Sequence, residues 1–255
     1  MKDNLKNALR STLNRLGLDL VTNDTMRRFE AFHRAARHAP DLLDCVIRQE
    51  RAQGAYTRFL QIGSNDGIRD DHLRKHILSH GLHGLMVEPN PGPFARLQSL
   101  YSKTEGIVLA NCAVGPEVGQ RNLYVFADQE EKGVPLDLYS AFDRQQLERV
   151  KHRNGYRSAI RSILVEVQTI HNLIDRYGLQ DASLLIIDTE GYDFEILKSI
   201  DLQVFQPRLI QMEHSNLSGS ATLDAVKFLV NAGYETSMGW RDMVGIRGES
   251  SPRTP

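Results

Sequence analysis

The sequence has little of several features that would mark special classes of protein. Cysteine occurs only twice, as Cys45 and Cys112, and their wide separation does not suit a metal site. Both lie in apolar or helical patterns, so we expect buried, reduced thiols. The sequence also lacks the continuous apolar segment of a secretion signal and any run of about 18 apolar residues that could cross a membrane. These absences favour a cytoplasmic protein.

An excess of charge of one sign is also missing. The 31 basic residues nearly balance the 32 acidic residues, so that the formal net charge is -1. Such a chain has no overall positive field to attract nucleic acid, and we expect no nucleic-acid partner. The hydrophobic share of 41% in 255 residues is sufficient for one substantial core.

Residues 1–57 are predicted to form an N-terminal helical extension. Its first part carries leucines at three- and four-residue steps with basic residues between them: Leu5, Leu9, Leu13, Leu16 and Leu20. The favoured interpretation is a helix that packs on the domain or over its active site. The alternative is a basic amphipathic helix in peripheral contact with a membrane, which would suit a lipid-linked acceptor. A second helical segment is predicted from Asp24 to Arg51, interrupted near Pro40.

Residues 58–247 show the pattern of an α/β domain, because short apolar runs alternate with amphipathic helices. The predicted strands are Phe59–Ile62, Leu85–Glu88, Ile107–Ala113, Leu184–Asp188 and Leu209–Glu213. The predicted helices are Asp70–Ser79, Pro93–Tyr101, Ile170–Tyr177, Phe194–Ile200 and Ala221–Ala232. Two final runs, Tyr234–Trp240 and Met243–Arg247, are predicted to pair as an antiparallel hairpin. We therefore predict a seven-stranded, mostly parallel sheet.

An insertion interrupts this domain at about residues 119–167. It contains a strand-like run, Asn122–Ala127, and a charged helix near Asp143–Arg153. Insertions at the carboxyl edge of such sheets commonly shape the substrate site, so we expect this segment to select the acceptor. The tail, residues 248–255, is predicted to be disordered.

A glycine turn follows the first predicted strand. Gly63 and Gly67 lie four residues apart, and they permit a tight turn in which backbone N–H groups can approach a ligand. The residues between them are Ser64, Asn65 and Asp66. The alternative interpretation is a purely structural turn, because short glycine turns after strands are common.

An acid ends the second predicted strand. Glu88, followed by Pro89, lies about 20 residues past the glycine turn, where a carboxylate can accept hydrogen bonds from both ribose hydroxyls of a nucleoside cofactor. NAD-binding folds usually carry G-x-G-x-x-G beside a pyrophosphate. Asp66 would repel a pyrophosphate but suits the ammonium group of S-adenosylmethionine (SAM). The combination favours SAM over NAD.

Three carboxylates follow the central predicted strand within six residues: Asp188, Glu190 and Asp193. At one mouth of a sheet they would raise one another's pKa values unless they were paired, solvated or bound to a cation. This arrangement is costly for a merely structural turn. The alternative is that Asp188 or Thr189 only caps the following helix.

Glu213 and His214 end the next predicted strand. Neighbouring parallel strands end at the same edge of a sheet, so we expect both residues beside Asp188 and Glu190. His214 is a candidate base because histidine titrates near neutral pH. The alternative is an ordinary surface or core histidine.

At these four places the sequence resembles the FkbM family of SAM-dependent methyltransferases. The resemblance runs from about Arg58 to Ile246, and its most specific part is Ile187–Asp193, which is similar to the D-x-E-G signature of that family. Further similarities lie at Gln61–Gly67, Val87–Pro89, Asn111–Gly115 and Val165–Thr169. The resemblance implies a Rossmann-like sheet with SAM at its carboxyl edge. It also implies methylation of a hydroxyl on a sugar, glycolipid or polyketide-type small molecule.

The resemblance also implies roles for individual residues. Residues 63–67 would hold the methionine end of SAM, Glu88 the ribose, and Asn111, Ala113 and Val114 would flank the adenine.

The sequence departs from the family pattern at two positions. Many members have an acid where Gln61 stands, so the contact to the ammonium group would be neutral here or supplied by Asp66. Asp193 replaces the more usual Glu after the D-x-E-G turn, which would shorten its reach.

For the mechanism we predict that Asp188, Glu190 or His214 removes the proton of the acceptor hydroxyl, while Glu213 orients the site. A divalent metal held by these carboxylates is an alternative that we do not predict. Two other functions stay open: a catalytically inactive SAM-fold binding module and an NAD-dependent oxidoreductase. The sequence carries no motif that specifies the acceptor or an oligomeric state.

Overall fold

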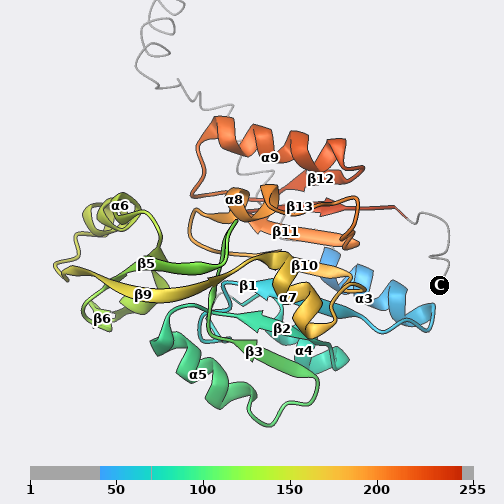
Figure 1. Cartoon of the computed structure of the whole chain (residues 1–255), viewed down its shortest axis with the longest axis horizontal. Coiled ribbons are helices and arrows are strands. Elements are labelled where there is room, and N and C mark those ends of the chain that lie inside the picture. Colours follow the sequence, from blue (N-terminus) through green and yellow to red (C-terminus); the bar gives the residue numbers. More distant parts are fainter. Residues whose placement is uncertain (1–40, 70, 249–255) are drawn as a thin grey trace, which may run out of the picture. The chain divides into compact units, whose positions relative to one another are not determined.

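A computed structural model describes residues 41–69 and 71–248 of the chain (Figure 1). The leucine-striped helix, most of the second predicted helix and residues 249–255 lie outside the described residues. The first described helix is α3 (Leu42–Ala52), which falls within the predicted N-terminal extension.

Seven strands form the main sheet, in the order β12-β13-β11-β10-β1-β2-β3. Their bounds are β1 Arg58–Ile62, β2 His83–Val87, β3 Ile107–Ala110, β10 Leu184–Ile187, β11 Leu209–Glu213, β12 Glu235–Met238 and β13 Asp242–Ile246. The first five along the chain pair in parallel, whereas β13 is antiparallel to both β11 and β12. The predicted mostly parallel sheet with a C-terminal hairpin is therefore confirmed.

Helices cover both faces of this sheet, as Figure 1 shows. The helices are α4 Arg74–His80, α5 Pro91–Tyr101, α7 Ile170–Tyr177, α8 Asp193–Lys198 and α9 Gly219–Asn231. One buried cluster joins α3, α4 and α5 to one face of the strands, and a second joins α7, α8 and α9 to the other face. Strand residues are buried on both faces, which explains why strands such as β10 (LLII) are continuously apolar.

The insertion builds a second sheet beside the main one (Figure 1). Its long strands β5 (Gly119–Phe126) and β9 (Ile160–Gln168) pair antiparallel, with β8 (Ser140–Ala141) and β4 (Ala113–Val114) at the two edges. A short two-stranded pair, a 3-10 turn and the charged helix complete it: β6 Glu130–Glu131, β7 Val134–Pro135, η1 Leu136–Leu138 and α6 Arg144–Asn154. The insertion has its own buried aromatic and aliphatic side chains, and it is a small packed unit rather than a loop.

Two expectations were wrong in detail. The predicted strand Ile107–Ala113 is two strands, because the chain leaves the main sheet after Ala110 and Ala113 pairs instead with Val167 of β9. Cys112 is buried as expected, whereas Cys45 is exposed. The reason is that α3 buries Leu43, Val46 and Ile47, so that Cys45 lies on its solvent side.

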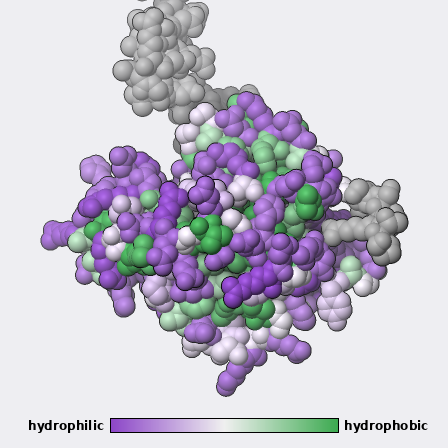
Figure 2. All heavy atoms as spheres, in the orientation of Figure 1, coloured by the Kyte–Doolittle hydropathy of each residue, from purple (hydrophilic) through white to green (hydrophobic). Residues whose placement is uncertain are grey.

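The surface seen in Figure 2 is mostly hydrophilic, with hydrophobic residues in small separate groups. Among residues 41–69 and 71–248, no helix combines the length and hydrophobicity required to cross a bilayer.

Candidate active site

A cavity of about 670 Å³ lies at the carboxyl ends of β1, β2, β10 and β11. Most of the site residues predicted from the sequence line it: Gln61, Gly63, Ser64, Asn65, Glu88, Pro89, Ala113, Val114, Asp188, Glu190, Glu213 and His214. Three predicted residues do not, namely Asp66, Gly67 and Asn111. The topology thus joins the glycine turn, Glu88 and the acidic mouth in one space.

Gly63 brings the two halves of this cavity into contact. Its φ is +85°, and a Cβ on it would lie 1.6 Å from the backbone oxygen of Asp188. Only glycine permits both this conformation and this approach of β1 to β10. Gly67 has φ +71°, and a Cβ there would lie 2.6 Å from Leu97 Cδ1 of α5, so Gly67 shapes the turn from behind.

Glu88 points toward the glycine turn. The backbone N–H of Asn65 donates to its Oε2 at 2.9 Å, and the N–H of Asn90 donates to its Oε1 at 2.8 Å. A carboxylate has about four acceptor positions, so two remain for a ligand. Burial raises the pKa of Glu88 to about 7, despite these two donors.

Asn111 supports this acid from outside the cavity. Its Nδ2 donates to the backbone oxygens of Glu88 at 2.8 Å and Pro89 at 3.2 Å, which holds the end of β2 in place. The next residues, Cys112, Ala113 and Val114, form an apolar wall of the cavity. Burial raises the pKa of the Cys112 thiol to about 11, so this cysteine is a packing residue.

Asp66 faces away from the cavity. Its Oδ1 accepts from the backbone N–H groups of Ile68 and Arg69, both at 3.1 Å, and its Oδ2 lies 3.1 Å from Arg69 Nη1 and 3.7 Å from Arg96 Nε. The carboxylate therefore stabilises the loop. It is not placed to contact an ammonium group in the cavity.

Gln61 and Asp71, rather than Asp66, line the cavity wall. Gln61 Nε2 donates to Asp71 Oδ1 at 3.2 Å. The other two oxygens, Gln61 Oε1 and Asp71 Oδ2, are buried and have no hydrogen-bond partner within the described part of the chain. Such orphaned acceptors are costly unless a ligand donates to them. Asp71 was not among the predicted site residues, because it fell inside the predicted helix Asp70–Ser79; in the structure α4 begins only at Arg74, and Asp71 accepts from the backbone N–H of Leu73 ahead of it.

The acidic mouth brings together Asp188, Glu190 and Glu213. One oxygen of each lies within 4.8 Å of the others. Burial and the neighbouring carboxylates raise the pKa of Asp188 well above its usual range, and they raise the pKa of Glu190 to about 7. Glu190 also has φ +56°, an uncommon conformation for a residue with a Cβ, and such strain is often found at functional sites.

Glu213 anchors this mouth. It is 2% exposed, and its oxygens accept from Ser215 Oγ at 2.7 Å, Asn216 Nδ2 at 2.8 Å and Arg241 Nη2 at 2.9 Å. Asn216 Nδ2 also donates to Glu190 Oε2 at 3.0 Å. Arg241 was missed in the sequence because it lies in the turn between β12 and β13, and only the antiparallel pairing brings that turn beside β11.

Asp193 stabilises the D-x-E-G turn by accepting hydrogen bonds from its backbone. Its carboxylate is fully buried and accepts from the backbone N–H groups of Thr189 at 3.1 Å and Gly191 at 2.9 Å. Neither Asp188 nor Thr189 caps α8, so that alternative interpretation is wrong. The short side chain of Asp193 suits this tight turn.

His214 lines the same cavity at the end of β11. Its backbone N–H donates to Arg241 O at 2.7 Å, and its ring Nε2 lies 3.2 Å from Gly239 O. If Nε2 carries the proton toward that carbonyl, Nδ1 keeps a lone pair that can accept a proton.

The insertion supplies the opposite wall with aromatic residues. Phe142 and Tyr192 meet edge to face at 5.0 Å between ring centroids. The Arg121 guanidinium lies 4.4 Å from the ring centre of Phe142, and its Nη1 donates to Tyr192 Oη at 3.0 Å. These contacts connect the insertion to the D-x-E-G turn, and Tyr139 and Trp240 add further aromatic surface to the cavity.

Comparison with known proteins identifies the family. The methyltransferase FkbM domain matches residues 61–236, which is more than half of the chain. The chain belongs to the FkbM methyltransferase family. No curated protein sequence matches it.

Several solved methyltransferase structures are similar to this FkbM chain. The FkbM methyltransferase from Methylobacillus flagellatus KT shares 16% identity, with 75% of this chain and 43% of that chain covered and a TM-score of 0.49. The present chain therefore spans less than half the length of that protein. A putative caffeoyl-CoA O-methyltransferase from Staphylococcus aureus shares 11% identity, with coverage of 96% and 100% and a TM-score of 0.41.

Membership of this family supports the interpretation of the chain as a SAM-dependent methyltransferase. The residues present fit that cofactor. The orphaned acceptors Gln61 Oε1 and Asp71 Oδ2 suit an ammonium group, and Glu88 retains two acceptor positions for a diol.

Proposed function

We propose that this FkbM protein methylates a hydroxyl oxygen of a sugar, glycolipid or polyketide-type small molecule. The proposal rests mainly on Asp188, whose partly buried carboxylate lies in the same cavity as Glu88 and receives no hydrogen bond from the described residues. A buried carboxylate without donors has a raised pKa and can accept the proton of a neutral hydroxyl. The aromatic wall of the insertion suits the carbon-rich faces of such acceptors.

Residues of this chain would hold the cofactor as follows. Glu88 accepts from the two ribose hydroxyls, and Gln61 with Asp71 accepts from the ammonium group. Ser64 and Asn65 follow the methionine end along the glycine loop, and Ala113 and Val114 flank the adenine. When bound, SAM supplies an electrophilic methyl group on a sulfonium.

The acidic mouth would prepare the acceptor. Asp188 removes the hydroxyl proton, Glu190 or His214 being the alternative base, and Glu213 holds Arg241 and Asn216 in position. The positive charge of Arg241 lowers the pKa values of Asp188 and Glu190 and so opposes the rise caused by burial, which favours an ionised carboxylate that can act as a base. Alignment of the hydroxyl against the insertion wall supplies the rest of the rate enhancement.

The first experiment measures turnover with a panel of glycan, glycolipid and polyketide-type alcohols. We expect Asp188→Asn to lower kcat by about 100- to 10,000-fold while SAM affinity changes little, because the amide cannot take a proton. His214→Gln tests the alternative base. His171→Gln is the matched control, since this histidine of α7 does not line the cavity.

Full turnover in the Asp188→Asn, Glu190→Gln and His214→Gln variants would disprove the assigned bases. Binding of SAM without turnover on any acceptor would favour an inactive binding module. Calorimetric binding of NAD in place of SAM would favour an oxidoreductase.

A metal-assisted reaction is tested separately. Asp188, Glu190 and Glu213 are close enough for a divalent cation to bridge them. We expect activity to survive exhaustive chelation, because Arg241 already supplies a positive charge at this mouth. Loss of activity that Mg²⁺ restores would instead assign hydroxyl activation to a metal.

A further inference from the structure

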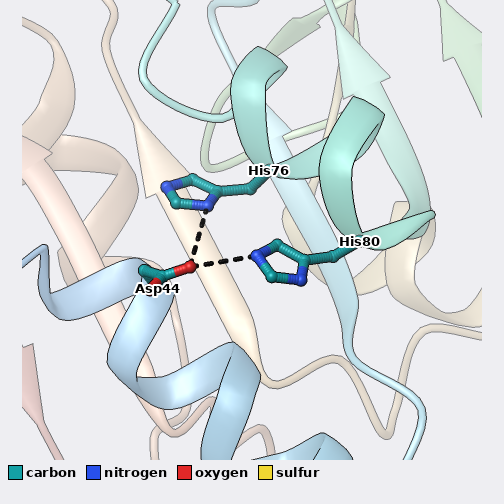
Figure 3. Close-up of side chains that lie close together, drawn as sticks. All are labelled: Asp44, His76 and His80. Atoms are coloured by element: carbon teal, nitrogen blue, oxygen red, sulfur yellow. Dashed lines mark hydrogen bonds and ion pairs between the residues drawn. The ribbon is translucent and has the colours of Figure 1, made fainter.

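Two histidines and one aspartate meet on the face of the domain covered by α3 and α4 (Figure 3). His76 and His80 both belong to α4, and Asp44 belongs to α3. None of these residues lines the cavity described above. The cluster is therefore separate from the active site.

Helical spacing explains how the two histidines act together. Residues four apart lie on the same face of a helix, so His76 and His80 project side by side. Their rings are stacked, with 5.9 Å between centroids and 16° between planes. Asp44 approaches from the neighbouring helix and points its carboxylate at both rings (Figure 3).

The distances are close to those of a metal site. Asp44 Oδ1 lies 3.0 Å from His80 Nε2 and 4.0 Å from His76 Nδ1. All three atoms lie within 4.8 Å of one another. Tetrahedral zinc, with bonds of about 2.0–2.2 Å, requires ligand atoms about 3.3 Å apart, so small side-chain movements suffice.

The surroundings allow an ion to enter. His76 is nearly fully buried, whereas the Asp44 side chain is 28% exposed, so solvent reaches the cluster from the Asp44 side. Arg48 Nε lies 2.5 Å from the other oxygen, Asp44 Oδ2, so Oδ1 stays directed at the histidines. Imidazole nitrogens with one carboxylate suit borderline transition metals better than Mg²⁺ or Ca²⁺.

We propose that Asp44, His76 and His80 bind one divalent transition-metal ion of the Zn²⁺ type. The ion would link α3 to α4. The segment carrying Asp71 and the cofactor loop leads directly into α4, so the ion would stabilise the support behind the cofactor site. The simpler interpretation is an Asp–His hydrogen-bonded contact between two helices, and it predicts no metal affinity.

The experiment uses the full chain after removal of metals with a chelator. Co²⁺ is titrated as a spectroscopic probe, Zn²⁺ affinity is measured by competition, and the melting temperature is recorded with and without Zn²⁺. We expect one equivalent of Zn²⁺ to displace Co²⁺ and to raise the melting temperature. Affinity should fall as the pH is lowered, because histidine must be neutral to coordinate.

Variants locate the ion. His80→Gln and Asp44→Asn should each weaken Zn²⁺ binding by about tenfold or more, since even indirect partners of metal ligands contribute that much. His152→Gln, an exposed histidine of α6, and Glu213→Gln in the acidic mouth should bind as the wild type does. Asp44 is partly exposed, so Asp44→Asn retains a folded protein for the measurement if His80→Gln does not fold.

Two results would overturn the proposal. The first is wild-type affinity for Zn²⁺ equal to that of the Asp44→Asn variant. The second is a Co²⁺ spectrum that disappears in Glu213→Gln but persists in His80→Gln or Asp44→Asn, which would place the ion in the acidic mouth.

Discussion

The carboxylates at the two ends of the cavity differ in their surroundings: those at one end accept backbone hydrogen bonds, and those at the other end lie close to one another. At the end proposed to hold the cofactor, Glu88 accepts from two backbone N–H groups, and Asp71 Oδ1 accepts from those of Leu73 and Arg74. At the acceptor end, Asp188, Glu190 and Glu213 crowd within 4.8 Å. Glu213 is fully satisfied, whereas Asp188 receives no hydrogen bond from the described residues.

This difference fits the proposed division between cofactor binding at one end and proton removal at the other. Backbone donors fix a carboxylate in one position, which suits recognition of a diol whose geometry does not change. A crowded group of acids raises the pKa values of its members and holds a proton near neutral pH, which suits a base. The end with Glu88 is therefore preorganised, as the proposed cofactor site requires, whereas the acids around Asp188 lower stability, as expected of the proposed base.

Gly63→Ala should have the largest effect on stability and on SAM binding, because it disturbs both ends of the cavity at once. The new Cβ would lie 1.6 Å from the backbone oxygen of Asp188. Because this oxygen belongs to the backbone, no movement of a side chain can relieve the clash. We expect a loss of about 3 kcal/mol or more in the free energy of unfolding, and loss of SAM binding. Gly178→Ala is the matched control, with φ +61° but no atom within 4 Å, and it should cost only about 1 kcal/mol.

Glu88→Gln should affect the cofactor end alone. Loss of the charged acceptor is expected to weaken SAM binding by about 10- to 100-fold in calorimetry. The diol favours the ionised carboxylate, whose pKa is about 7 without ligand, so wild-type affinity should fall as the pH drops below 7. The variant should lose most of this pH dependence. An unchanged SAM affinity would show that Glu88 does not hold the ribose.

At the other end of the cavity, Glu190→Gln should raise the free energy of unfolding. The pKa of Glu190 is about 7 in the folded protein and near 4.5 in the unfolded chain, so its ionisation costs stability as the pH rises from about 4.5 to 7. Removing the charge should add about 1–2 kcal/mol at pH 8 and much less at pH 5, measured by urea unfolding.

The exposed Glu195 of α8 is the control for that measurement. Glu195→Gln should change stability by less than about 0.5 kcal/mol at either pH. A destabilised Glu190→Gln variant at pH 8 would mean that Asn216 and Arg241 compensate the charge of Glu190 completely.

Local sequence patterns predicted the central features well. The apolar runs and helical periods predicted which segments form the strands and helices of the main sheet, because a strand buried on both faces must be apolar throughout. The predicted positions of Glu88, Asp188 and Glu213 at strand ends followed from the same pattern, since the carboxyl ends of parallel strands meet at one edge. These inferences needed only the order of residues along the chain.

Other features depended on contacts between distant segments. The sequence suggested Asp66 for the ammonium group, but the loop turns Asp66 inward and leaves Gln61 and Asp71 in the cavity wall. Arg241 reaches Glu213 only because β13 pairs antiparallel with β11. Residues 107–113 divide between two sheets because Ala113 finds a partner in β9, which no local pattern encodes.

The amino-acid sequence by itself determined which residues end each strand, and therefore the family, the fold and the acids at the cavity. The tertiary structure alone decided the direction of each side chain, the partners that shift the pKa values, and the meeting of Asp44 with His76 and His80. The physical reason is that strand and helix periods arise from near neighbours along the chain. Side-chain orientation and charge balance depend instead on hydrogen bonds and burial supplied by residues far away in sequence.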